Sequence, residues 1–176
     1  MKRSDIKSLP AYFDKYINQV DDIELDTAFQ NNLNTMSGLD IKSLESLKDK
    51  VYAPGKWTIK DVFQHMIDTE RVFAYRTLRF ARKDGITPQG YDQDVFAANT
   101  NTQQRSLKDM IDEMKLVHQS SCLLFRSFDK ATLQATGICW NQETSVLAMG
   151  FIITGHFIHH WKIITEKYLP LQYATA

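Results

Sequence analysis

The chain has 176 residues, of which 43% are hydrophobic and 11% aromatic, and this suits one globular domain over residues 1–176 and excludes a disordered polymer. Its 21 basic and 21 acidic residues cancel, so the composition offers no electrostatic footprint for nucleic acid or an anionic membrane. The two cysteines, Cys122 and Cys139, are too few for a disulfide framework and lack zinc-finger spacing.

The N-terminal part predicts a short helix followed by a long one. Apolar residues between Ile6 and Val20 indicate the short helix, which Pro10 interrupts. From Glu24 to Met36, apolar residues recur at three- and four-residue spacing, which predicts a helix that ends at Ser37-Gly38. Residues 39–50 form a connection with room for one helical turn.

The second long helix has a clear start signal. Thr58 stands three residues before Asp61, in the manner of a capping box, and Pro54-Gly55 precedes it as a turn. We expect this helix to run to about Lys83, before Gly85. The basic residues of its last turns suit the negative end of the helix dipole and predict a solvated surface.

The rest of the chain predicts two more long helices. Residues 85–104 form a long polar connection that is either functional or contains a short helix. A helix follows over 106–128, and another over 145–168 that ends before Pro170. No segment shows sustained strand alternation. Together these elements predict an all-α fold, a four-helix bundle with a short extra N-terminal helix.

The expected location is the cytoplasm. The first residues lack the apolar core of a signal peptide, and no apolar run approaches the ~20 residues of a membrane-spanning helix. We therefore expect no membrane partner.

Two of the five histidines are spaced so that both could bind the same metal ion. His156 and His160 lie four residues apart, so on a helix both imidazoles face the same side. The face through His160 continues through apolar residues, whereas the face through His159 passes Gly155, Lys162 and Glu166. His160 is therefore the better inward partner of His156, and His159 is expected at the rim of the site or on the surface.

A third histidine, His65, lies on the core-facing stripe of the second long helix. Spacing alone leaves hydrogen-bonded core histidines as the alternative to a metal site. Three neutral imidazoles at one point are costly to bury, and a divalent ion would satisfy them together. His65, His156 and His160 are thus the candidate metal ligands, with the core-histidine alternative still open, and three ligands would leave a coordination position for water or substrate. Histidine ligands suit zinc, nickel, iron or copper and do not choose among them; zinc or nickel is our expectation, with iron as the alternative.

Other polar residues have weaker claims. Asp68, three residues after His65, is a candidate to accept a hydrogen bond from a ligand histidine or to act as a catalytic base, and a salt bridge with Arg71 is the simpler interpretation. His118 has no partner at ligand spacing, which favours a core or surface role. Cys139 is expected to be buried. Neither a His-Glu-x-x-His motif nor the Glu-x-x-His pairs of di-iron bundles occur.

Two segments resemble the signatures of the DinB-like (DinB/YfiT) superfamily. These are Trp57–Glu70 around His65, and Gly155–His160; the resemblance covers nearly the whole chain. It implies a four-helix bundle in which His65, His156 and His160 bind a divalent metal, and it suggests a homodimer.

The resemblance also implies candidate functions. Some relatives are metal-dependent transferases that join a low-molecular-weight thiol to an electrophile, and this is the leading hypothesis, with Tyr91 and Asp94 shaping the substrate entrance. Metal-assisted hydrolysis or isomerisation, with Asp68 as base, is a related enzyme hypothesis. The rival is a non-enzymatic, stress-associated dimeric binding module whose metal is structural or incidental.

Overall fold

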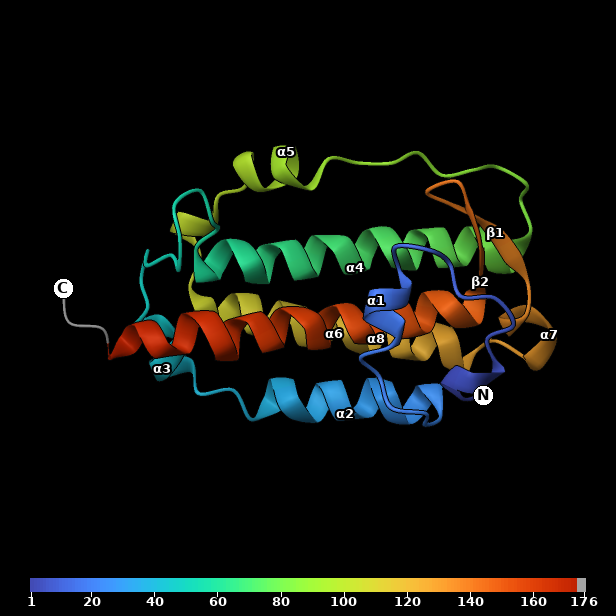
Figure 1. Ribbon diagram of the computed structural model, residues 1–176, viewed down its shortest axis with the longest axis horizontal. Coiled ribbons are helices and arrows are strands. Elements are labelled where there is room, and N and C mark those ends of the chain that lie inside the picture. Colours follow the sequence, from blue (N-terminus) through green and yellow to red (C-terminus); the bar gives the residue numbers. More distant parts are fainter. Residues whose placement is uncertain (174–176) are drawn as a thin grey trace.

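The chain forms a bundle of four long helices, α2 (Leu25–Ser37), α4 (Ile59–Arg82), α6 (Leu107–Arg126) and α8 (Val146–Ile163). The structure is a computed structural model and describes residues 1–173. α4 packs against α6 and α8, and α2 packs against the same two helices from the other side, so that α2 and α4 lie at opposite corners (Figure 1). The expected four-helix bundle is confirmed.

Local signals set the helix boundaries where they were predicted. The Thr58 hydroxyl accepts a hydrogen bond from the Asp61 N–H at 3.3 Å, and the Asp61 carboxylate accepts one from the Thr58 N–H at 3.0 Å, which is the expected capping box. Ser106 and Ser145 cap α6 and α8 through their hydroxyls in the same way. α8 continues as one π-helical segment over Ile164–Tyr168 and a 3-10 turn over Leu169–Gln172.

The smaller elements refine the prediction. The extra N-terminal helix is present, but α1 (Asp14–Ile17) is a single turn, because Tyr12 has a positive φ of 70° that breaks the expected longer helix. A 3-10 turn over Arg3–Asp5 precedes it, and α3 (Ile41–Glu45) supplies the turn expected in the connection before α4.

The long connection of residues 85–104 does contain a short helix. α5 (Gln93–Ala98) begins at Asp92, whose carboxylate accepts the N–H groups of Asp94 and Val95, and a 3-10 turn follows over Thr102–Gln104. Figure 1 shows this segment running along α4 on the side away from α2.

The expectation that the chain has no strands is wrong for one short hairpin. After α7 (Lys130–Leu133), β1 (Thr136–Cys139) and β2 (Gln142–Ser145) pair antiparallel, with Thr136 opposite Ser145. Its two turn residues, Trp140 and Asn141, both have positive φ, which is the geometry of a tight two-residue hairpin turn. Strands of four residues are too short to show alternation in the sequence.

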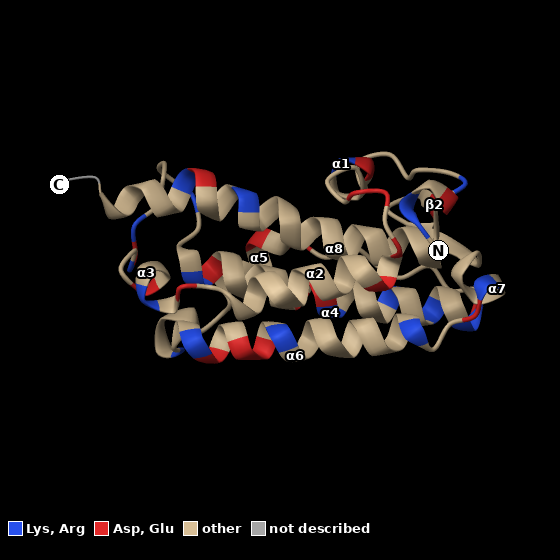
Figure 2. Cartoon of the chain, turned by 90° about the horizontal axis from the view of Figure 1, so that it is seen from below, with Lys and Arg blue, Asp and Glu red and all other residues tan. Residues whose placement is uncertain are grey.

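The core has two hydrophobic clusters along the bundle axis, and α8 belongs to both. Its residues from Val146 to Phe157 are all buried, so this stretch is apolar around its whole circumference. Figure 2 shows charged residues along the outside of α6, whereas α8 has none before Lys162. His156 lies between Ile153, in the first cluster, and Phe157, in the second. No helix of the described residues is long and apolar enough to cross a membrane.

A buried hydrogen-bonded contact between Glu70 and His118 joins α4 to α6. Both carboxylate oxygens of Glu70 lie 2.9–3.0 Å from the Nδ1 atom of His118, and His118 is fully buried, so of the core and surface roles left open by the sequence it has the core one. Its Nε2 atom has no hydrogen-bond partner among the described residues, and the His118 ring lies 4.9 Å from that of Phe29. Glu70 therefore belongs to the core and has no free carboxylate for a site.

Replacement of Glu70 by leucine is expected to lower the free energy of unfolding by about 3 kcal/mol, because a buried histidine would lose its only strong partner. Urea titration followed by circular dichroism measures this loss. The double variant Glu70→Leu/His118→Leu is the control and should recover much of it, since both polar groups then leave the core. Additive losses in the double variant would show that the two side chains do not interact.

Candidate metal centre

Three histidine side chains meet between α4 and α8. The Nε2 atom of His156 lies 3.2 Å from Nε2 of His65 and 3.1 Å from Nε2 of His160. One ligand nitrogen from each ring falls in a group whose atoms all lie within 4.8 Å of one another, and no carboxylate or thiol of the described residues joins this group. We call these three residues the histidine cluster.

Hydrogen bonds alone do not account for the cluster. An imidazole nitrogen carries either one proton or one in-plane lone pair, so Nε2 of His156 can form only one good hydrogen bond. It nevertheless has two close nitrogen neighbours. A tetrahedral zinc ion bound at about 2.0–2.1 Å holds its ligand nitrogens about 3.3 Å apart, close to the two separations observed. The donor set therefore fits a divalent cation at the centre of the cluster.

Burial keeps the three rings neutral. Desolvation, followed by the charge of His159, lowers the pKa of His65 to about 4. Burial also depresses the pKa of His156 and His160 well below the usual histidine value, with the neighbouring rings adding to the effect. At neutral pH each ring thus has a nitrogen lone pair ready for a metal, with no proton to displace.

Without a bound ion, the stability of the protein is expected to fall on acidification from pH 7 to 5. The unfolded His65 takes up a proton near pH 6.5, whereas the folded one does so near 4, so stability is complete above about 6.5 and declines below it. His65 alone should contribute a loss of about 2 kcal/mol over this interval. Urea unfolding in a chelator at several pH values measures it.

The control for this pH dependence is His65→Ala, in which the decline should be shallower. A free energy of unfolding that is independent of pH between 7 and 5 would contradict the lowered pKa values.

The surrounding side chains hold the cluster in place. The Thr69 hydroxyl lies 3.3 Å from Nδ1 of His65 and 2.7 Å from the Tyr91 hydroxyl, which links a ligand histidine to the long connection. The Trp57 ring packs 4.8 Å from that of His65, and the edge of Tyr16 meets His156 at 5.2 Å. Thr69 was detectable in the sequence, since it stands one turn after His65. Tyr16 had no such signal.

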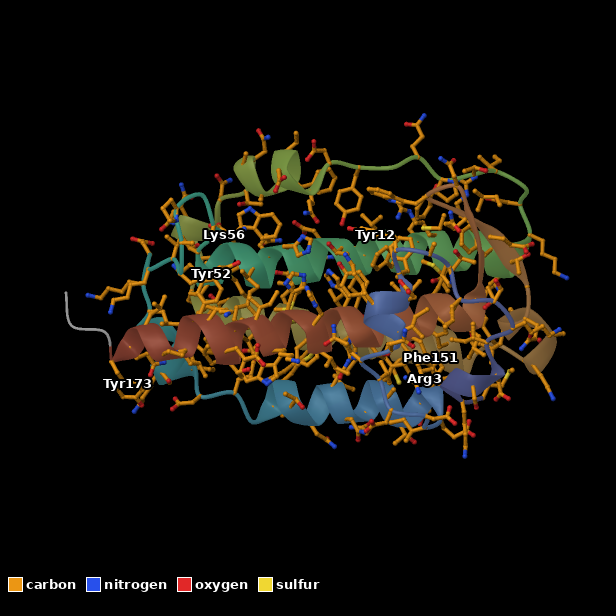
Figure 3. The ribbon with its side chains drawn as sticks, in the orientation of Figure 1. Arg3, Tyr12, Tyr52, Lys56, Phe151 and Tyr173 are labelled. Carbon is orange, nitrogen blue, oxygen red and sulfur yellow. The ribbon has the colours of Figure 1, made fainter. Side chains whose placement is uncertain are left out.

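Two cavities flank the cluster. The first, of about 450 Å³, reaches His65 and His156, and we call it the aromatic cavity because its wall contains six aromatic residues: Tyr12, Phe13, Tyr16, Phe73, Tyr91 and Trp140. The second, of about 420 Å³, reaches His160 and is lined by Tyr52, Lys56 and Asp94 among others. In Figure 3, Tyr52 and Lys56 lie near the start of α4, and Tyr12 lies further along it. Tyr91 and Asp94 thus line the cavities beside the cluster.

Asp68, the candidate base, makes contacts outside the histidine cluster. The Asp68 carboxylate accepts a hydrogen bond from Gln64 at 2.9 Å and lies 3.9 Å from Arg71, so the expected salt bridge is present, while Nδ1 of His65 pairs with Thr69 instead. Burial raises the pKa of Asp68.

His159 and Cys139 lie where the sequence indicated. His159 is half-buried at the rim, with its Nδ1 atom 3.1 Å from the Gln19 amide. Cys139 is buried.

Comparisons with known proteins identify the family and support the fold. A model of the DinB superfamily matches residues 7–164. Among solved structures, YfiT from Bacillus subtilis, described as a probable metal-dependent hydrolase with an unusual four-helix bundle topology, superposes with a TM-score of 0.69. It is 16% identical in sequence, and the alignment covers 96% of this chain and 93% of that one. A search of curated proteins finds no match.

Proposed function

The chain belongs to the DinB superfamily, and from that premise we propose that it is a divalent-metal-dependent enzyme acting on a small molecule. The observation that carries the proposal is the position of the histidine cluster, which has three converging nitrogens and opens toward two cavities. A purely structural ion needs no such access, because structural zinc sites close their coordination with a fourth protein ligand.

His65, His156 and His160 would hold the ion, and zinc or nickel is our first expectation, with iron as the alternative. When bound, the ion would supply Lewis acidity that lowers the pKa of a thiol or water molecule in its remaining position. Thr69 would fix the orientation of the His65 ring through Nδ1, as partners of ligand histidines commonly do. The aromatic cavity would exclude water from the reacting groups.

Thiol transfer is the reaction that we propose first. No carboxylate oxygen of residues 1–173 joins the histidine cluster, so the cluster itself contains no carboxylate base. A thiol, with a pKa near 8.5, needs far less help than water to lose its proton. The thiol proton would pass to solvent, the sulfur would form a bond to the electrophilic carbon, and the leaving group would depart with its electron pair.

Hydrolysis is the second candidate, and the likeness to YfiT favours it. The contacts of Asp68 do not support that residue as the base, because its carboxylate is engaged with Gln64 and Arg71. We also propose that the protein is a homodimer, which light scattering after gel filtration would test.

Purified, tag-free protein should be loaded with Zn²⁺ or Ni²⁺ and assayed with cysteine or coenzyme A against 1-chloro-2,4-dinitrobenzene. Metal-dependent conjugation above the uncatalysed rate, lost in His65→Ala and kept in His159→Ala, is the expected result. Metal-dependent cleavage of p-nitrophenyl acetate without conjugation would instead favour the hydrolase. Metal binding with neither activity would favour the non-enzymatic binding module.

A further inference from the structure

Arg76 is a buried cation in the wall of the aromatic cavity. Its side chain is only 2% exposed, yet it lines the same cavity as His65 and His156. Arg76 follows His65 by eleven residues, or three helical turns, so both side chains project from one face of α4.

This guanidinium has no anionic partner among residues 1–173. No carboxylate of those residues lies within 4.0 Å of it, although eight other lysine, arginine or N-terminal cations form such pairs: Met1, Arg71, Arg79, Arg105, Lys108, Lys115, Arg126 and Lys162. Arg76 donates only to the Gln89 carbonyl oxygen at 3.0 Å and to the Cys139 sulfur at 3.6 Å. Burial raises the pKa of the Cys139 thiol, so that this group is neutral and supplies no countercharge at pH 7.

A buried cation without a countercharge is costly, and a ligand anion would relieve the cost. A guanidinium has five N–H donors in a fork that matches two carboxylate oxygens, and the two contacts of Arg76 leave donors free for such a ligand. The rings of Phe73 and Tyr91 lie 5.9 Å from its Cζ atom and shield it from water. The geometry therefore favours a carboxylate over a neutral group.

The mouth of the cavity adds an apolar surface. Tyr12 and Trp140 stack with parallel rings whose centroids lie 5.5 Å apart, although the two residues are far apart in the sequence. Both residues have positive φ, an uncommon conformation for bulky side chains, and both line the cavity. A ligand that passes this pair would place an apolar body against aromatic rings.

The cavity also limits the ligand's charge and length. Its one lining carboxylate, Asp92, is held by the N–H groups of Asp94 and Val95 and would repel a second negative charge. Eleven helical residues separate the Cα atoms of His65 and Arg76 by about 16 Å, and the Arg76 side chain leans back toward His65. A ligand that reaches both residues is elongated.

We propose that Arg76 is the anion-binding residue of the aromatic cavity, and that the ligand is an elongated organic monoanion with an apolar body and a terminal carboxylate. The reaction of the ligand's other end at the histidine cluster rests on the proposed function. The binding of its carboxylate by Arg76 does not depend on that function.

The test uses 4-phenylbutanoate and its neutral amide, 4-phenylbutanamide, as probes of the full-length protein, both in a chelator and with Zn²⁺. Isothermal titration calorimetry should show the carboxylate binding at least tenfold more tightly than the amide, with or without Zn²⁺. The carboxylate should also shift the arginine Nε–H resonance that disappears in Arg76→Lys. Because binding in a chelator needs no metal, failure of the metal proposal would leave this result intact.

Arg76→Met, which keeps an unbranched stem, should abolish the preference for the carboxylate, and Arg76→Lys should keep part of it. If Arg76→Met fails to fold, the comparison of the two probes on the unaltered protein still decides the question. Equal affinities for the carboxylate and the amide in a chelator, or an unchanged preference in folded Arg76→Met, would overturn the proposal.

Discussion

Replacement of His156 by alanine is expected to weaken Zn²⁺ binding by more than about 100-fold, since even changes to the partners of ligand histidines cost 10- to 100-fold. Nε2 of His156 is the nitrogen with close contacts to both other rings, at 3.2 and 3.1 Å, so its loss leaves His65 and His160 without the central ligand. Isothermal titration calorimetry on chelator-treated protein measures the change directly.

Thermal unfolding gives a second measure of this effect. At a free Zn²⁺ concentration 100 times the dissociation constant, the unaltered protein should gain about 2.7 kcal/mol from the metal. For a chain of this length, that gain corresponds to a rise in Tm of roughly 5–11 °C. His156→Ala should show almost none of it at the same concentration.

His159→Ala is the matched control, because His159 lies on the same helix, three residues away, and pairs with Gln19 rather than with the cluster. It should bind Zn²⁺ like the unaltered protein. Equal losses in both variants would indicate a general disturbance of α8. Stoichiometric, tight binding in His156→Ala would refute the assignment of the cluster.

Replacement of Gly155 by alanine is expected to lower the free energy of unfolding by about 3 kcal/mol, at the upper end of what overpacking costs. A Cβ atom at this position would lie 2.0 Å from the backbone carbonyl oxygen of Tyr16, and backbone cannot move aside as a side chain can. α1 would have to leave α8, and the Tyr16 ring that meets His156 would leave with it. Chemical denaturation measures the loss, and Zn²⁺ affinity should fall in parallel.

Gly150→Ala is the control for this prediction, because it lies on the same helix and gains the same helix propensity of about 1 kcal/mol. Its added Cβ would meet side-chain atoms of Leu25 and Phe125, at 2.6 Å and above, which can repack. We expect Gly150→Ala to be clearly more stable than Gly155→Ala. If Gly155→Ala were instead the more stable variant, the contact of α1 with α8 would not depend on the missing side chain at Gly155.

Much of the fold could be predicted because its signals are local. The capping pair of Thr58 and Asp61, the capping serines Ser106 and Ser145, and the apolar periodicity each act within a few residues. The hairpin was missed because its turn is Trp140-Asn141 and lacks the glycine that commonly marks such turns. The N-terminal helix was overestimated because periodicity does not reveal the backbone break at Tyr12.

The sequence by itself determined that His156 and His160 share a face of one helix, since helical geometry fixes this, and the apolar residues on that face indicated that it points inward. Only the tertiary structure decided that His65 meets them, because 91 residues separate His65 from His156 and no local period encodes such a contact. The same holds for the partnership of Glu70 with His118 across the core. It holds as well for Arg76, whose lack of a countercharge depends on every residue that the fold brings near it.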